Sequence, residues 1–332
     1  MTRRFHLAAM GFAAVTLALA APVAKAEYPD KPVRIQVGFG AGGGADIMAR
    51  WYADKLQKAS GGTFIVENRV GASGNLALAA TAKASPDGLT LLFASTTTTA
   101  GNASVFKNMP LDVTKDIIPI ASFAETPFVL AVAPDSPINS IPDLTAYLKS
   151  KGGKATYGSA TTASLASTAM YLKAAGVEAT HVGYKATPAS IQDVTAKQID
   201  FAFGDVVFTS GQAKQGRVKL LAITSDERSP GLPDVPSLKD FGAATGDITA
   251  LWGLWVTART PKDITDKLAK WMNDISRSDE TRKFLIAQGA TPKAGTQEEY
   301  KKRFNAALKA WAEAAKVAKI EPQSPSRQDE NV

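Results

Sequence analysis

Three glycines near the start of the chain have the spacing of a nucleotide-binding loop. Gly38, Gly40 and Gly43 follow a strand-like run, residues 33–37, and precede an amphipathic helical pattern. The order G-x-G-x-x-G between a strand and a helix is typical of loops that bind a dinucleotide. Glu67, at the end of the next strand-like run, lies about where a ribose-binding carboxylate is expected. Taken alone, these residues indicate a dehydrogenase.

Side chains able to do nucleophilic or metal chemistry are scarce. Beyond residue 26 the chain has one histidine, His181, and it has no cysteine at all. A Ser-His-Asp triad or a common zinc site would need His181, whose strand pattern favours a structural role. Asp46 and Asp205 could form a carboxylate pair, but nothing in the sequence brings them together, and Asp46 suits a helix start, where it would cap free N–H groups. We therefore expect no catalytic residue, metal or cofactor.

The first 26 residues have the pattern of a secretory signal peptide. Arg3 and Arg4 are positive, residues 7–21 are apolar and uncharged, and residues 24–26 form an A-x-A cleavage signal. We expect cleavage after about Ala26 and export to the bacterial periplasm. The periplasm normally contains no pool of nicotinamide cofactor. Export therefore argues against the interpretation of the loop as a dinucleotide site. The same loop physics favours any anion, because glycines let backbone N–H groups approach closely, and a carboxylate would serve as well as a phosphate.

The length of the chain predicts its number of domains, and its net charge limits the classes of partner. About 306 residues would remain after cleavage, which exceeds what one core usually supports, so two domains are expected. The formal charge of +7 falls to +4 when the three basic residues of the signal are removed. The remaining basic residues are scattered, which makes nucleic acid an unexpected partner, and we expect a monomer. Residues 321–332 are polar and are expected to form a disordered tail.

Strand-like and helix-like runs alternate along most of the chain, which predicts an α/β fold with mainly parallel sheets. In such sheets ligands bind at the carboxyl ends of strands, in the loops that lead to helices. The expected strands are 33–37, 64–67, 89–94, 128–133, 155–158, 180–184, 201–203 and 220–224, and the expected helices are 46–59, 75–84, 141–151, 165–175, 188–196 and 261–275.

Two continuous apolar stretches, residues 126–133 and 250–256, break this rhythm. Each could be an ordinary buried strand, or the two could be strands by which the chain crosses between domains and returns. The block between them is domain-sized, which favours crossing. We therefore expect a discontinuous first domain (27–126 and 250–320), an inserted second domain (127–249) and a cleft between them.

Three loops at strand ends could supply an anion site in this cleft. The glycine loop spans residues 38–46, a second loop spans 159–164, and a run of Ser and Thr spans 95–99. In the second loop Ser164 is the expected N-cap, and hydroxyls of Ser159, Thr161 and Thr162 can donate hydrogen bonds. A solvated loop is the plain alternative for each run taken singly.

Several segments carry a family resemblance that extends from about residue 28 to residue 320. They are YPDKPVRIQVGFGAGGGADIMAR (28–50), VENRVGASGN (66–75), SPDGLTLLF (85–93), ATHVGYK (179–185) and ITSDERSPGLPDVPS (223–237). In order and spacing they resemble the tripartite tricarboxylate transporter receptor family, the Bug-type periplasmic solute-binding proteins. The Arg-Pro segment 228–236 is especially specific, since no general structural rule demands it.

The resemblance implies a two-domain periplasmic binding protein of the Venus-flytrap, type II-like form, with two connecting strands. It implies a ligand carboxylate held by loops 38–46 and 159–164, largely through backbone amides and ordered waters, and delivery to a membrane permease of the transporter. A catalytic role is not part of the family pattern. The sequence departs from that pattern at Ala45, where Thr is usual, and at Asp205, where the usual acid lies one position earlier.

Neither central loop contains Lys or Arg, so we expect neutral donors to hold an aromatic or short aliphatic carboxylate. Phe39 could stack on a planar ligand, while Asp205 would deter a second bare carboxylate unless water or Lys185 intervened. An amino acid, whose ammonium could meet Asp205, remains an alternative, as do a sensor of the same fold and a secreted hydrolase or lyase. The candidate ligand-binding residues are Phe39, Gly40, Ala41, Gly42, Gly43, Asp46, Thr97, Thr98, Ser159, Thr161, Thr162, Ser164, Lys185 and Asp205.

Overall fold

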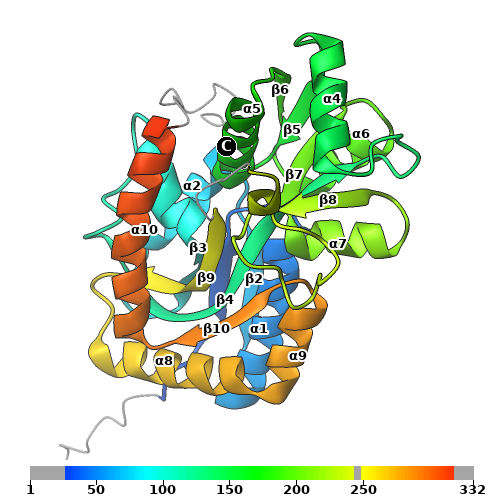
Figure 1. Cartoon of the computed structure of the whole chain (residues 1–332). Helices are drawn as coiled ribbons and strands as arrows, with labels where there is room; N and C mark the ends of the chain where they lie inside the picture. Colours follow the sequence, from blue (N-terminus) through cyan, green and yellow to red (C-terminus); the bar gives the residue numbers. More distant parts are fainter. Residues whose placement is uncertain (1–26, 243–247, 318–332) are drawn as a thin grey trace, which may run out of the picture.

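The structure, a computed structural model, describes residues 27–242 and 248–317 of the 332-residue chain. The predicted signal peptide and the predicted disordered tail lie outside the described residues. Figure 1 shows two groups of strands, each with its own helices, that meet along the long strand β4. The α/β class and the two-domain form are confirmed.

Two β-sheets share strand β4. In the first sheet β1 is parallel to β2 and β3, and in the second β5 is parallel to β6 and β7. Strands β4, β8, β9 and β10 pair antiparallel with their neighbours, so each sheet is mixed. The strands are β1 (Val33–Val37), β2 (Phe64–Asn68), β3 (Thr90–Ser95), β4 (Ile117–Val132), β5 (Thr156–Ser159), β6 (Thr180–Gly183), β7 (Phe201–Asp205), β8 (Lys219–Ile223), β9 (Thr249–Thr257) and β10 (Thr291–Gly295).

Helices flank both sheets. In Figure 1 α1, α2, α8, α9 and α10 surround the first sheet, and α4 to α7 surround the second. The α-helices are α1 (Gly44–Ser60), α2 (Asn75–Ala82), α3 (Asn102–Val105), α4 (Ile141–Lys151), α5 (Thr162–Ala175), α6 (Thr187–Thr195), α7 (Val206–Lys214), α8 (Lys262–Arg277), α9 (Asp279–Ala287) and α10 (Gln297–Val317), with short helical turns η1 (Ala72–Gly74), η2 (Thr97–Gly101) and η3 (Leu238–Phe241). Within the described ranges no helix has the length and apolar character of a membrane span.

Strand β4 passes from one sheet into the other. Its residues up to Pro127 pair with β9, where Pro127 lies opposite Thr249. From Phe128 onward it pairs with β7 and β8 instead, and Phe128 lies opposite Asp205. The two apolar stretches that the sequence singled out therefore meet at one pair, Thr126 opposite Ala250, next to the point where β4 leaves the first sheet.

The eight expected strands and six expected helices are all present, most of them within two residues of the expected bounds. The Ser/Thr run is the exception, because residues 95–99 do not form a loop. Strand β3 extends to Ser95, and the helical turn η2 begins at Thr97. Residues 96–99 are at most 3% exposed, and a buried backbone needs internal hydrogen-bond partners, which a helical turn supplies.

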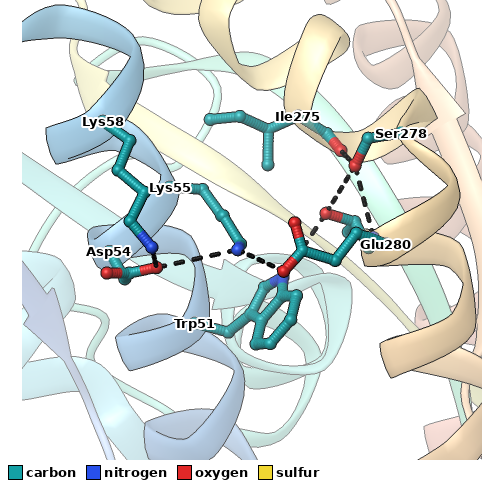
Figure 2. Close-up of polar contacts among 8 residues, drawn as sticks. Trp51, Asp54, Lys55, Lys58, Ile275, Ser278 and Glu280 are labelled. Atoms are coloured by element: carbon teal, nitrogen blue, oxygen red, sulfur yellow. Dashed lines mark hydrogen bonds and ion pairs between the residues drawn. The ribbon is translucent and has the colours of Figure 1, made fainter.

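A packed contact holds α1 against α9 (Figure 2). The ring of Trp51 stacks on that of Phe284, with centroids 4.1 Å apart. Lys55 Nζ lies 4.4 Å from the Trp51 ring centroid and 2.6 Å from Glu280 Oε1. The Lys55 side chain is 14% exposed, so its stem is buried in this contact while its charge is paired. The contact joins α9 to α1, whose first turn reaches the site described below.

Candidate functional site

A cavity lies between the carboxyl ends of the two sheets. Its enclosed volume is about 30 Å³, and the value rises to about 440 Å³ when the adjoining space that is open to solvent is counted. Loops of both domains and both crossing strands contribute to its wall. The lining residues are Phe39, Gly40, Gly43, Gly44, Ala45, Ser95, Thr97, Phe128, Thr161, Ala186, Thr187, Pro188, Asp205 and Trp252.

The glycine loop enters this wall from the first domain. Gly42 has a φ of 78°, which favours glycine, and its N–H donates to Asp46 Oδ2 at 2.9 Å. The N–H of Gly43 donates to the carbonyl of Gly40 at 3.3 Å. A Cβ on Gly38 would lie 2.5 Å from Gly74 Cα, so this glycine permits the close approach of the neighbouring loop. The amides of Gly42 and Gly43 thus shape the loop itself.

Asp46 holds the glycine loop from behind and does not line the cavity. It is buried, and it accepts hydrogen bonds from Arg50 Nε and Asn68 Nδ2, each at 2.9 Å, as well as from Gly42. Burial alone would raise the pKa of this carboxyl, but the bonds from Arg50, Gly42 and Asn68 outweigh it and hold the pKa below its usual value. Asp46 therefore stays ionised and acts as a support of the loop at the start of α1.

The second loop uses its hydroxyls to build a helix start. Thr161, and not Ser164, is the N-cap of α5, and Ser164 stands at the third helical position in a reciprocal capping box. Ser164 Oγ accepts the N–H groups of Ala160 and Thr161 at 3.1 and 3.0 Å. The expectation of Ser164 as N-cap is wrong by three residues, because Thr161 has the extended backbone that an N-cap needs.

Two further hydroxyls of this loop bond within the protein. Ser159 Oγ lies 2.6 Å from His181 Nε2, on the neighbouring strand β6. Thr162 Oγ1 donates to Asn102 Oδ1 at 2.6 Å, which joins the second domain to the first. His181 is exposed, yet partial desolvation lowers the pKa of its imidazole and favours the neutral form. The geometry around His181 is that of a structural contact.

Asp205 enters the cavity wall from the end of β7. It is the N-cap of α7, and its Oδ1 accepts the N–H of Phe208 at 2.9 Å. Asp205 Oδ1 also lies close to the backbone of Gly44 on the opposite domain, so that a Cβ added to Gly44 would lie 2.0 Å from it. Burial raises the pKa of the Asp205 carboxyl, and the donors around it oppose the rise.

The rest of the wall is largely apolar, with one unpaired hydroxyl. Phe39, Phe128 and Trp252 face the cavity, and Trp252 Nε1 donates to Thr126 Oγ1 at 2.8 Å. Thr97 is 3% exposed, and its buried Oγ1 has no hydrogen-bond partner. A buried polar atom without a partner is costly, so Thr97 Oγ1 is suited to a polar atom that enters the cavity.

The structure brings together some of the candidate residues and leaves others aside. Six of them line the cavity, namely Phe39, Gly40, Gly43, Thr97, Thr161 and Asp205. Ala41, Gly42 and Lys185 are exposed and lie outside the lining. Asp46, Thr98, Ser159, Thr162 and Ser164 are buried behind it.

The sequence analysis did not select a third strand-to-helix loop or the aromatic residues of the two crossing strands that line the cavity. Ala186, Thr187 and Pro188 follow the predicted strand at 180–184, so the rule that selected the other two loops would have found them. Phe128 and Trp252 lie in the two apolar stretches predicted to cross between domains, where side chains of one face must meet the cleft. Gly44, Ala45 and Ser95 also line the cavity; they lie within the predicted segments 38–46 and 95–99 but were not among the single candidate residues.

Comparison with known proteins gives consistent matches. Residues 48–318 match the model of the tripartite tricarboxylate transporter family receptor. Protein BugT of Bordetella pertussis is 28% identical over 309 residues, which cover 92% of this chain and 95% of BugT.

Solved structures agree with these sequence matches. The R. palustris protein Rpa4515 with adipate superposes with a TM-score of 0.86 at 27% identity, over 89% of this chain and all of that protein. MatC from Rhodopseudomonas palustris with bound malate gives a TM-score of 0.81 at 25% identity, over 86% of this chain and 99% of MatC.

Proposed function

Because this chain belongs to the tripartite tricarboxylate transporter receptor family, a family of solute-binding receptors, we propose that it captures a small carboxylate and delivers it to a membrane permease of that system. The observation that carries the proposal is the cavity between the domains, into which two strand-to-helix loops from opposite sides present glycine backbone and a helix start. Related structures hold adipate and malate, which are small carboxylates.

We place the protein in the periplasm. The first 26 residues have the charge, apolar core and cleavage pattern of a secretory signal peptide. A receptor of this family would meet its solute there before the permease takes it up. We expect it to act as a monomer whose partners are an organic acid and the permease subunits.

The cavity chemistry favours an aromatic or short aliphatic carboxylate. Its lining contains no Lys or Arg, so neutral donors must hold the anion, and each hydrogen bond to a charged acceptor contributes about 1.5–3 kcal/mol. Phe39, Phe128 and Trp252 offer apolar surface for the body of the ligand. Asp205 would repel a second bare carboxylate placed beside it, so a dicarboxylate would have to keep its second charge away from this residue.

An amino acid is the second candidate. The buried carboxyl of Asp205 lies in the cavity wall and could pair with a ligand ammonium. Binding of an amino acid with loss of affinity on removal of the ammonium group would favour this candidate over a simple acid.

We propose a hinge where the two domains join. Residues 27–126 and 250–320 would form one domain and residues 127–249 the other, with bending near residues 124–128 and 249–252. The change of partner sheet between Pro127 and Phe128 supports this division. A ligand that touches both domains binds the closed form better and shifts the equilibrium toward it.

A thermal-shift screen tests the proposal. Purified protein would be heated with aromatic acids, short dicarboxylates, citrate, amino acids and uncharged sugars. We expect stabilisation by at least one carboxylate, which should be recovered unchanged. Stabilisation by uncharged sugars alone would refute it, and turnover that is lost in His181→Ala would favour a hydrolase or lyase instead.

A further inference from the structure

One buried hydrogen bond joins the two proposed domains outside the cavity. Thr162 Oγ1 donates to Asn102 Oδ1 at 2.6 Å. Thr162 is the first residue of α5, in the second domain, and Asn102 is the first residue of α3, in the first domain. Neither residue lines the cavity, and their exposed fractions are 4% and 0%. The bond therefore connects the domains behind the cavity wall.

The acceptor of this bond is held in place by its own domain. The side-chain amide of Asn102 donates to Ser73 O at 3.0 Å and to Asn75 Oδ1 at 2.9 Å. Both amide hydrogens are used in this way, so the amide oxygen faces Thr162 and the Thr162 hydroxyl is the donor. These partners of Asn102 all belong to the first domain. Asn102 is therefore a preformed acceptor whose orientation does not depend on the second domain.

Both partners lie directly behind the two loops that face each other across the cavity. Thr161, the residue before Thr162, is the N-cap of α5 and lines the cavity. On the other side Asn102 bonds both neighbours of Gly74, and a Cβ on Gly38 of the glycine loop would lie 2.5 Å from Gly74 Cα. The bond between Thr162 and Asn102 therefore forms only when these two loops are brought together across the cavity.

Separation of the domains would change the surroundings of Asn102 Oδ1. A buried acceptor without a partner is costly, whereas an acceptor that water can reach is not. With the domains together, the Thr162 hydroxyl is the partner that this buried oxygen needs. With the domains apart, water can take its place. Loss of the Thr162 hydroxyl would therefore penalise only the arrangement in which the domains meet.

We propose that Thr162 and Asn102 form a latch between the domains, which sets how tightly the protein holds a ligand without touching that ligand. The inference rests on the proposed function, because it takes the domains to close on a bound solute. A bond that stabilises the closed form raises the affinity for every ligand that requires closure by the same factor. Thr162 is then a positioning residue, where the sequence predicted a donor to the ligand.

The test removes the hydroxyl and keeps the shape of the side chain. In Thr162→Val the acceptor on Asn102 loses its donor, and in Thr162→Ser a hydroxyl is restored at the same position. Calorimetric titration with benzoate, adipate and malate measures the affinity. We expect Thr162→Val to bind each acid that binds the wild type about tenfold more weakly, which corresponds to about 1.4 kcal/mol, and Thr162→Ser to recover most of the loss.

Thr168→Val is the matched control. Thr168 is also buried on α5, but its hydroxyl donates to the carbonyl of Ser164 within the same helix at 2.9 Å. The substitution therefore removes a buried threonine hydroxyl without removing a bond between the domains. We expect its affinity for the three acids to equal that of the wild type.

The outcomes separate the latch from the proposed function. Unchanged affinity in Thr162→Val, or an equal loss in Thr168→Val, would overturn the latch. A loss that differs between the three acids would also overturn it, since Thr162 would then contact the ligand. If only an uncharged sugar binds the wild type, the carboxylate proposal fails, yet the latch still predicts an about tenfold loss for that sugar in Thr162→Val.

Discussion

A Cβ atom on Gly44 would lie 2.0 Å from Asp205 Oδ1 and 2.9 Å from Val207 Cβ. Both neighbours belong to the other domain. They therefore obstruct a side chain at Gly44 only when the cleft is closed. Gly44 is helical and lies at the start of α1, where alanine fits the backbone at least as well as glycine. The glycine is therefore required by the closed form and not by the helix.

Gly44→Ala is expected to hold the cleft open. The added methyl group cannot pass Asp205 and Val207, so scattering should show an expanded protein even with saturating ligand. Carboxylate affinity should fall by about tenfold or more, because only the open form is accessible. Gly211→Ala, on α7 with free space around it, is the matched control and should bind normally. A compact, fully binding Gly44→Ala protein would contradict the closed geometry.

Thr97→Val tests the unpaired hydroxyl. The substitution keeps the shape and removes a polar atom without a partner, so the ligand-free protein should melt at the same or a higher temperature. If Thr97 bonds the ligand, carboxylate affinity should fall by about ten- to hundredfold, as expected for a bond to a charged group. Calorimetric titration measures this loss. Unchanged affinity would show that the ligand does not reach Thr97.

Asp46 should make stability depend on pH on the acid side. Its folded pKa lies below the usual aspartate value of 3.8, so its contribution to stability is present above that value and is lost as the pH falls through the folded pKa. Asp46→Asn should cost about 2 kcal/mol near pH 7, in line with hydrogen bonds to charged groups, and much less near pH 2. Denaturant unfolding at several pH values measures the difference. Asp54→Asn, which loses an exposed ion pair with Lys58, should cost far less, and an equal cost would refute the role given to Asp46.

Gly253→Ala should lower the stability of the fold and leave the closure of the cleft unchanged. A Cβ there would lie 2.0 Å from the Tyr300 ring and 2.6 Å from the carbonyl oxygen of Ala121, both within the first domain. Overpacking of this kind typically costs 1–3 kcal/mol or more, so the melting temperature should drop clearly. The fraction that folds should close and bind as the wild type does. Unaltered stability would mean that α10 packs on β9 differently.

Local patterns in the sequence were sufficient for much of the fold. Alternating periodicities located the strands and helices of both sheets, and the apolar stretches marked the strands that cross between them. The glycine loop was found because Gly38, Gly40 and Gly43 have a recognisable spacing between a strand pattern and a helix pattern. Such a spacing can be read within a single segment.

The remaining features depend on contacts between distant segments. Ser159 and Thr162 look like free donors in the sequence, but His181 and Asn102 take their hydrogen bonds in the folded chain. The close approach of Gly44 and Asp205 joins residues of opposite domains, so no spacing in the sequence predicts it. Thr98, Ser159, Thr162 and Ser164 were selected by residue type, and burial then placed them behind the wall.

The most direct test of carboxylate capture is a calorimetric titration of the wild-type protein with a matched pair of ligands, a bound acid from the screen and its uncharged primary amide. The two differ little in shape, so the comparison isolates the charge that the cavity is proposed to recognise. We predict that the acid binds one-to-one with micromolar or better affinity and that the amide binds at least about a hundredfold more weakly, since several bonds to a charged acceptor are lost or weakened. Equal affinity for acid and amide would contradict the proposed recognition of a carboxylate.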